Sequence, residues 1–169
     1  MKVEDFEAIA LPHLQALLRT AARMLGNRCE AEDAVQETYL RAWRFINRFT
    51  PGTNIRAWLF KILFHVVSHQ RRKWLRFDGG WTANVEAGWE ATLIYQPPVT
   101  QHLTDQEIIA ALGRLPESFQ AVLLLAVVEE FSYKESAEIL QIPIGTVMSR
   151  LHRARKMLAC NLRESAHGE

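Results

Sequence analysis

The stretch that decides the fold is residues 131–158, FSYKESAEILQIPIGTVMSRLHRARKML. Ser132 and Glu135 have the spacing of an S-x-x-E capping box, which starts a helix. Pro143 cannot continue that helix, and Gly145 accepts the backbone conformation of a turn or a cap. A second, longer helix is predicted from about Thr146. The pattern is typical of a helix-turn-helix, which places its second helix in a DNA major groove.

The predicted second helix carries an apolar stripe and a cationic stripe on opposite sides. The apolar stripe is formed by Val147, Leu151, Ala154 and Leu158. The cationic stripe contains Ser149, His152, Arg153 and Lys156, flanked by Arg150 and Arg155. Because a basic helix face is often only solvated, this segment alone leaves DNA binding and plain solvent exposure as open alternatives.

The net charge of +1 conceals two basic islands. Residues 41–76 hold nine cations and no acid, and residues 148–163 hold five cations and no acid. Between them, residues 77–147 hold ten acids and two cations. Since the distribution of charge determines the attraction to a polyanion, the two islands predict contact with nucleic acid at two places.

Most remaining segments have helical periodicity, so the predicted fold class is all-α, with two small helical domains joined by a flexible linker. We expect an N-terminal domain over residues 1–76, a linker over 77–103 and a C-terminal helix-turn-helix domain over 104–169, each domain packing its own helices. Helices are predicted over residues 6–25, 30–45, 55–76, 104–115 and 117–130, with Thr104 as an N-cap. The core candidates of the first helix are Ile9, Leu14, Leu17, Leu18 and Leu25.

Several protein classes are disfavoured by the sequence. No apolar run approaches the roughly 18–20 residues that span a bilayer, and the acidic N-terminus lacks a signal-peptide pattern, so we expect no membrane insertion and a cytoplasmic location. Cys29 and Cys160 form no C-x-x-C pair. His65 and His69 are spaced i, i+4 without a third ligand nearby, so no metal site and no cofactor are predicted. Phosphate loops and nucleophile motifs are missing, so an enzyme is not expected.

Four motifs follow one another along the chain. They are AEDAVQETY at 31–39, PGTNIRAWLFKI at 51–62, RLPESFQAVL at 114–123 and IGTVMSRLHRAR at 144–155. In this order and spacing they resemble the extracytoplasmic-function sigma factors, the small two-domain specificity subunits of bacterial RNA polymerase. The resemblance runs from about Leu14 to Leu162. It implies a protein that recruits polymerase and separates promoter strands without covalent chemistry of its own.

The resemblance implies roles for two regions of the N-terminal domain. The first motif is implied to dock on a coiled coil of the largest subunit of core RNA polymerase, through Asp33, Gln36, Glu37, Leu40 and Arg41. The second motif is implied to bind the minus-ten promoter element as a single strand, through Phe49, Thr50, Asn54, Arg56, Lys61, His65, Arg71 and Arg72. These side chains supply the cations and the aromatic group that single-strand capture requires. Trp58 lies on the apolar stripe and is expected in the core.

The fourth motif is implied to enter the major groove of the duplex minus-thirty-five element. The implied contacts are Thr146, Ser149, Arg150, His152, Arg153 and Lys156. Arginine pairs well with guanine O6 and N7, although phosphate contacts usually outnumber base contacts. Because the family is commonly held inactive by an anti-sigma factor, the resemblance also implies such a partner.

Two positions depart from the family pattern. Met148 stands where many relatives carry a cation, which weakens one implied DNA contact. His65 stands where asparagine is usual, which changes the donors and acceptors offered to a base. Two alternative functions remain: a stand-alone helix-turn-helix regulator, which would bind duplex DNA without polymerase, and a helical adaptor that binds a protein through residues 30–45. The two acid-free islands disfavour the adaptor.

Overall fold

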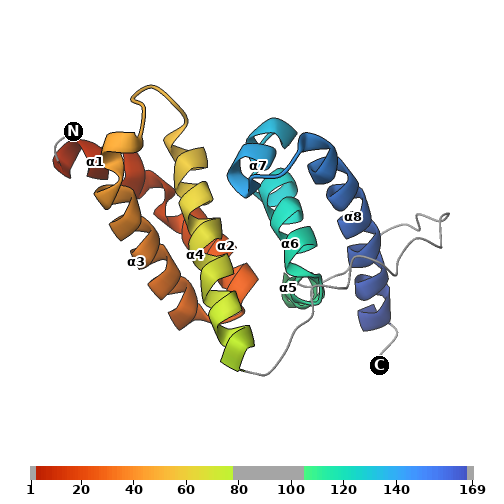
Figure 1. Ribbon diagram of the computed structural model, residues 1–169. Helices are drawn as coiled ribbons and strands as arrows, with labels where there is room; N and C mark the ends of the chain where they lie inside the picture. Colours follow the sequence, from red (N-terminus) through yellow and green to blue (C-terminus); the bar gives the residue numbers. More distant parts are fainter. Residues whose placement is uncertain (1–2, 78–104, 167–169) are drawn as a thin grey trace.

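The computed structural model describes residues 3–77 and 105–166. Every regular element in those residues is a helix, which confirms the all-α prediction. The helices form an N-terminal bundle that ends with α4 and a C-terminal bundle that begins with α5, and the two bundles lie side by side (Figure 1). Beyond Phe77, the predicted linker lies outside the described residues, as does the predicted N-cap Thr104.

A turn of 3-10 helix interrupts the first predicted helix. The N-terminal bundle consists of α1 (Val3–Ala10), η1 (Leu11–His13), α2 (Leu14–Leu25), α3 (Arg28–Arg44), η2 (Ile46–Arg48) and α4 (Ile55–Phe77). The prediction of one helix over residues 6–25 was therefore wrong, because Pro12 lacks the N–H that α1 would need to continue. The carbonyl of Ala10 instead accepts a hydrogen bond of 2.8 Å from the Tyr39 hydroxyl. Burial raises the pKa of Tyr39 to about 12.

The interruption also breaks the predicted apolar stripe. Leu17 is fully buried, and Leu18 and Leu25 are partly buried against the core. Ile9 and Leu14, however, keep 37% and 36% of their surface exposed, so their assignment to the core was wrong. The reason is that the 3-10 turn changes the rotation of α1 relative to α2, and one stripe no longer faces one core.

The C-terminal bundle contains the predicted helix-turn-helix. Its elements are α5 (Asp105–Gly113), α6 (Glu117–Leu123), the π-helical turn η4 (Leu124–Val128), α7 (Tyr133–Leu140) and α8 (Ile144–Ala166). The capping box is confirmed: Ser132 Oγ accepts from the Glu135 N–H at 3.2 Å, and the Ser132 N–H donates to the Glu135 carboxylate at 2.9 Å.

The turn between α7 and α8 differs from the prediction at Gly145. The residue that leaves the helical conformation is Gln141, with a φ of 56°, whereas Gly145 lies inside the first turn of α8. The carbonyl of Pro143 accepts hydrogen bonds from the N–H groups of Thr146 and Val147, which starts α8 at Ile144. The left-handed position therefore closes α7 and does not open α8.

Two apolar clusters stabilise the fold. The smaller lies within the C-terminal bundle and contains Leu112, Leu115, Val122, Leu123, Leu151 and Ala154. The larger joins side chains of α1–α4 to five residues of the C-terminal bundle, which are Ala121, Leu124, Leu125, Phe131 and Ile139. Accordingly α4 packs against α7, and α2 packs against α5 and α6. The sequence predicted that each domain packs its own helices; the larger cluster in addition packs the two bundles against each other.

Candidate functional site

The outer face of α8 presents the predicted cationic stripe to solvent. Val147, Leu151 and Ala154 are buried, so the opposite side of the helix must face outward. Ser149, His152 and Arg153 are exposed there, and Thr146, Arg150 and Lys156 are partly buried. Ser149 Oγ donates to the carbonyl of Thr146 at 3.1 Å. The structure therefore gathers the six predicted residues on the solvent side of one helix.

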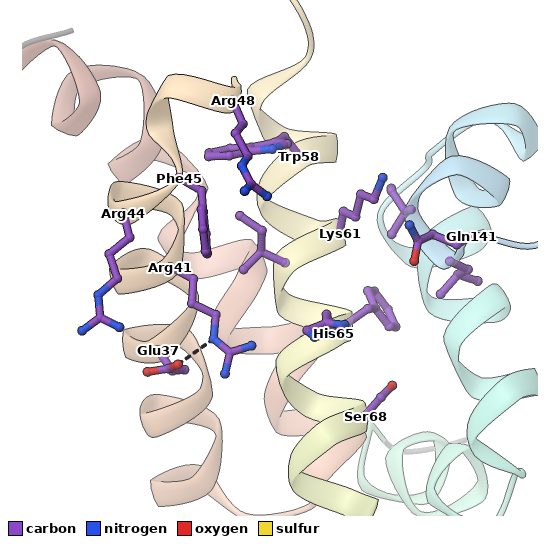
Figure 2. Close-up of a pocket in the computed structure, with 14 residues that line it drawn as sticks. Glu37, Arg41, Arg44, Phe45, Arg48, Trp58, Lys61, His65, Ser68 and Gln141 are labelled. Carbon is purple, nitrogen blue, oxygen red and sulfur yellow. Dashed lines mark hydrogen bonds and ion pairs between the residues drawn. The ribbon is translucent and has the colours of Figure 1, made fainter. Parts of the chain in front are cut away.

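A second surface is a groove of about 850 Å³ between α3, α4 and α7, which we call the cationic groove (Figure 2). Its basic lining side chains are Arg41, Arg44, Arg48, Lys61 and His65. Its aromatic lining side chains are Phe45, Trp58 and Phe64. The Arg48 guanidinium lies 4.8 Å from the centre of the Phe45 ring. Cations beside aromatic rings are the combination that binds a single nucleic-acid strand.

A third surface, the apolar groove, lies between α2 and α3 and has a volume of about 490 Å³. Its lining residues are Leu14, Leu18, Glu32, Val35, Gln36, Tyr39, Leu40 and Trp43. Leu40 and Trp43 keep 48% and 37% of their surface exposed, which is unusual for large apolar side chains grouped together. An exposed apolar hollow of this kind is typical of a protein–protein contact.

The predicted polymerase-binding residues are divided between these two grooves. Gln36 and Leu40 line the apolar groove. Glu37 and Arg41 line the cationic groove, where Arg41 Nε donates to Glu37 Oε1 at 2.6 Å. Asp33 is exposed on α3. The single set predicted from the sequence therefore spans two faces of α3.

The predicted minus-ten residues are not brought together either. Lys61 and His65 are exposed and line the cationic groove. Phe49 is buried, with 8% of its surface exposed, and cannot serve as an open platform in this conformation. The carbonyl of Thr50 accepts from the N–H and the hydroxyl of Thr53, which closes the loop as a turn. Arg71 and Arg72 belong to α4, within its last turns.

The remaining two predicted minus-ten residues contact the C-terminal bundle. Asn54 caps α4, because its Oδ1 accepts from the Ala57 N–H at 3.1 Å, and its Nδ2 donates to Glu135 Oε1 at 2.9 Å. Arg56 forms an ion pair with Glu129, with 2.7 Å between Nη2 and Oε2. In this conformation, acidic side chains of the C-terminal bundle hold both residues.

Sequence reasoning missed Arg44 and Arg48 in the cationic groove. A signal was present, because Arg41, Arg44 and Arg48 are spaced i, i+3, i+7 and can share one side of a helix. The sequence also contains no indication that Glu129 binds Arg56, or that Glu135 accepts a hydrogen bond from Asn54 in addition to capping α7. No local pattern could have found these contacts, because their partners lie 73 and 81 residues away.

The structure contains no candidate metal cluster and no candidate membrane span in the residues it describes. Within residues 3–77 and 105–166, no three histidine, cysteine or acidic side chains are placed to hold a metal ion. No helix in the same ranges has the length and apolar character needed to cross a bilayer.

The chain matches two family models, one for each bundle. Residues 9–76 match the model described as Sigma-70 region 2, and residues 105–158 match the model described as Sigma-70, region 4. The first model covers the loop, the apolar groove and the α3 and α4 sides of the cationic groove. The second covers α7, which forms the remaining side of the cationic groove, and the whole α8 stripe.

Curated relatives match over most of their length. The chain is 39% identical to the ECF RNA polymerase sigma factor EcfG of Rhodopseudomonas palustris, over 90% of this chain and 81% of the relative. It is 34% identical to the ECF RNA polymerase sigma factor SigW of Bacillus subtilis, over 84% and 80% of the two chains. Among solved structures, the sigma factor RpoE in complex with the anti-sigma factor NepR, from Bartonella quintana, has a TM-score of 0.77 and 32% identity. That likeness covers 95% of this chain and 98% of the other.

Proposed function

Because the chain belongs to the extracytoplasmic-function sigma factors of the sigma-70 family, we propose that its three surfaces divide polymerase binding and promoter recognition among them. As an RNA polymerase sigma factor, the protein has core polymerase and promoter DNA as its partners. It is an initiation factor, and the polymerase carries out the catalysis. The observation that supports the division is that the basic side chains of the cationic groove lie in one segment that matches a family model and those of the α8 stripe in the other.

The α8 stripe is proposed to bind the minus-thirty-five element as duplex. Arg153 is exposed on the solvent side of α8, while Leu151 and Ala154 anchor the helix in the smaller apolar cluster. A rigid helix with outward cations fits the width of a major groove, and an arginine there can donate two hydrogen bonds to guanine. Contacts with phosphates and adjacent bases are proposed for the other residues of the predicted set, which are Thr146, Ser149, Arg150, His152 and Lys156.

The loop 49–54 and the cationic groove are proposed to hold the minus-ten element after its strands separate. Lys61 and His65 are exposed side chains of α4 that line the groove, and Arg48 lies beside Trp58 near the start of that helix (Figure 2). A strand that follows the groove would meet cations for its phosphates and the rings of Phe45 and Trp58 for its bases. Arg44 and Arg48 therefore join the residues proposed to contact this strand.

The apolar groove is proposed to bind the coiled coil of the largest polymerase subunit, with Gln36 and Leu40 at the centre of the contact. An extended helical partner can fill an exposed apolar hollow, and the polar side chains at its edge determine orientation. Asp33 lies on the same helix, and Glu37 with Arg41 is proposed to contact the partner from the opposite edge of α3.

An anti-sigma factor is proposed as a further partner. The supporting observation is that RpoE of Bartonella quintana, which resembles this chain along nearly its whole length, binds the anti-sigma factor NepR. A protein of this group works together with polymerase, so the cytoplasm is its proposed location. We also propose two domains, residues 1–76 and 104–169, joined by a linker over residues 77–103 that leaves their relative position adjustable.

Run-off transcription with core polymerase over a promoter library tests the proposed function. Product is expected only when the chain and core polymerase are both present, whereas a stand-alone regulator would bind duplex promoter DNA without polymerase. The polymerase surface is tested separately with Gln36→Ala combined with Leu40→Ala, which should weaken binding to core at least tenfold in fluorescence anisotropy. Gln106→Ala, an exposed glutamine of α5, is the control. Equal affinity of the double variant and the control, with unchanged helical circular dichroism, would exclude this groove.

A further inference from the structure

Two large apolar side chains are exposed in the first two turns of α8. Ile144 keeps 49% of its surface exposed and Met148 keeps 53%. The two residues are spaced i, i+4, so their side chains adjoin on one face of the helix. We call them the apolar pair. Because they form a small contiguous patch and not two scattered side chains, their exposure calls for a physical reason.

The packing of α8 does not require the apolar pair. The α8 side chains buried against the rest of the bundle include Val147, Leu151 and Ala154, and neither member of the pair belongs to either apolar cluster. The helix packs on α5, α6 and α7 and forms the side of the C-terminal bundle away from α4 (Figure 1). The pair is therefore available to a partner outside the chain.

Gly145 leaves the helix surface beside the pair open. It follows Ile144 directly and precedes Met148 by three residues, so it adjoins the pair on the surface of α8. The residue is exposed and helical, and nothing lies within 4 Å of a Cβ added there. Glycine is unfavourable in a helix relative to alanine, and the fold has no need of it at this position. A glycine of this kind permits the close approach of a partner to the backbone.

The apolar pair is continuous with the cationic stripe of α8. Ile144, Met148 and exposed His152 are spaced i, i+4, i+8 and form one row along the helix. Residues 148–163 hold five cations and no acid, so the surroundings of the pair attract a polyanion. An acid-free, cationic border favours duplex DNA over a protein as the partner that covers the pair.

The major groove of DNA offers a specific apolar group to such a pair. The N-terminal residues of a recognition helix are the ones that contact base edges, and the pair lies in that part of α8. An isoleucine or methionine side chain cannot donate a hydrogen bond to a base or a phosphate. The apolar group on the major-groove edge of a base pair is the C5 methyl group of thymine.

We propose that Ile144 and Met148 select thymine in the minus-thirty-five duplex by packing against its C5 methyl group. This inference rests on the proposed binding of that duplex by α8. The methyl group belongs to one strand of an A·T pair, so the contact distinguishes T·A from A·T as well as from G·C. The arginines of the stripe supply charge and guanine contacts, and the apolar pair adds a preference that no cation of the helix provides.

Deoxyuridine tests the proposal, because it pairs with adenine as thymidine does and lacks only the C5 methyl group. The minus-thirty-five element is taken from promoters selected by run-off transcription, and each thymine of either strand is replaced singly. The affinity of the holoenzyme, formed from the full chain and core polymerase, is measured by competition between the two duplexes. The wild type should prefer thymine about fourfold at one position or more, which corresponds to about 0.8 kcal/mol for one buried methyl group.

The decisive variant combines Ile144→Ala with Met148→Ala, and both positions are exposed, so the fold should be retained. This variant should bind the thymine and deoxyuridine duplexes equally. Met148→Leu should keep the preference, because leucine restores an apolar contact. The matched control is Leu11→Ala, which removes a side chain of 51% exposure from the N-terminal bundle and should keep the wild-type preference. Because the preference compares two duplexes on the same holoenzyme, a change in polymerase affinity cancels.

The thymine contact is overturned if the wild-type holoenzyme binds every deoxyuridine duplex as tightly as the thymine duplex, or if the selected element contains no A·T pair. It is also overturned if the double variant keeps the wild-type preference; weaker binding of that variant to core polymerase would then assign the apolar pair to a protein contact. Absence of transcription from every library promoter overturns the proposed function itself. Transcription with no effect of deoxyuridine overturns only the thymine contact.

Discussion

The ring of Phe49 packs against the indole of Trp58, with centroids 5.2 Å apart and planes inclined by 44°. Phe49 belongs to the loop before α4, and Trp58 lies in the first turns of α4. The pair fixes one end of the loop to the helix that carries Lys61 and His65. The loop is therefore held in position by an aromatic contact, and Thr50 and Asn54 remain exposed beyond it.

Phe49→Ala is expected to lower the free energy of unfolding by about 3 kcal/mol, because it removes a buried ring and leaves a cavity beside Trp58. The measurement is urea denaturation followed by circular dichroism. Thr50→Ala, at the exposed neighbouring position, should change the stability by less than about 0.5 kcal/mol. Equal stability of the two variants would show that the Phe49 ring contributes no packing energy.

His65→Asn is expected to change base preference at one position of the minus-ten element. His65 is exposed in the cationic groove. The substitution replaces two ring nitrogens on opposite sides of an imidazole with the adjacent NH2 donor and carbonyl acceptor of an amide, so a different base edge should be preferred. The measurement is transcription from promoters randomised at both elements, with His69→Asn as the control one turn further along α4. Identical preference profiles for wild type and His65→Asn would mean that His65 reads no base.

Arg153→Ala is expected to reduce promoter discrimination by roughly 1–3 kcal/mol if Arg153 contacts a base. If it contacts only phosphate, binding should weaken evenly across sequences and the salt slope should decrease by about one. Competition binding of the polymerase holoenzyme at several salt concentrations separates the two results. Arg155→Ala removes the same charge from another exposed position of α8 and serves as the reference. If Arg153→Ala and Arg155→Ala showed the same sequence preference and the same salt dependence, a specific role of Arg153 in promoter recognition would be excluded.

Gln141→Gly and Gly145→Ala are both expected to stabilise the C-terminal bundle. Gln141 has a φ of 56°, which glycine adopts without the steric cost of a side chain, so the gain should be about 1 kcal/mol. Gly145 is helical and nothing lies within 4 Å of an added Cβ, so alanine should gain roughly 0.5–1 kcal/mol. Thermal unfolding measures both. The control is Gln141→Ala, which keeps a Cβ at the left-handed position and should not raise the stability comparably. If Gln141→Ala stabilised the protein as much as Gln141→Gly, the left-handed conformation assigned to this residue would be contradicted.

Glu135→Gln is expected to destabilise the protein by about 1 kcal/mol at neutral pH, because it weakens the capping box of α7. Hydrogen bonds from the Ser132 backbone N–H and hydroxyl lower the pKa of the Glu135 carboxyl from its ordinary value of 4.5. The stabilisation by the carboxylate is therefore complete above pH 4.5 and is lost as the pH falls through the lower folded value. Urea denaturation from pH 3 to 7 should show the difference from wild type shrinking at low pH. Glu138→Gln, on the exposed side of the same helix, should show no such convergence.

Local sequence signals were sufficient for the helix-turn-helix. The capping box at Ser132 and the apolar stripe of Val147, Leu151 and Ala154 depend on residues three or four positions apart, and the structure confirms both. The outward position of Ser149 and Arg153 followed from the same periodicity. Local signals were misleading about which residue of the turn adopts the left-handed conformation. Gly145 was a plausible cap, but Gln141 takes the left-handed position because α7 ends there.

The sequence by itself determined the helical class, the positions of most helices and the two basic islands, because helix periodicity and charge are properties of neighbouring residues. Only the tertiary structure decided which side chains of those islands are exposed and which contacts they make. It divided the residues predicted to bind polymerase between two faces of α3, buried Phe49 against Trp58, and paired Arg56 with Glu129 across 73 positions of the chain. Such contacts depend on how helices pack within and between the bundles. That packing is determined by the apolar surface the helices bury together, which no short segment of sequence contains.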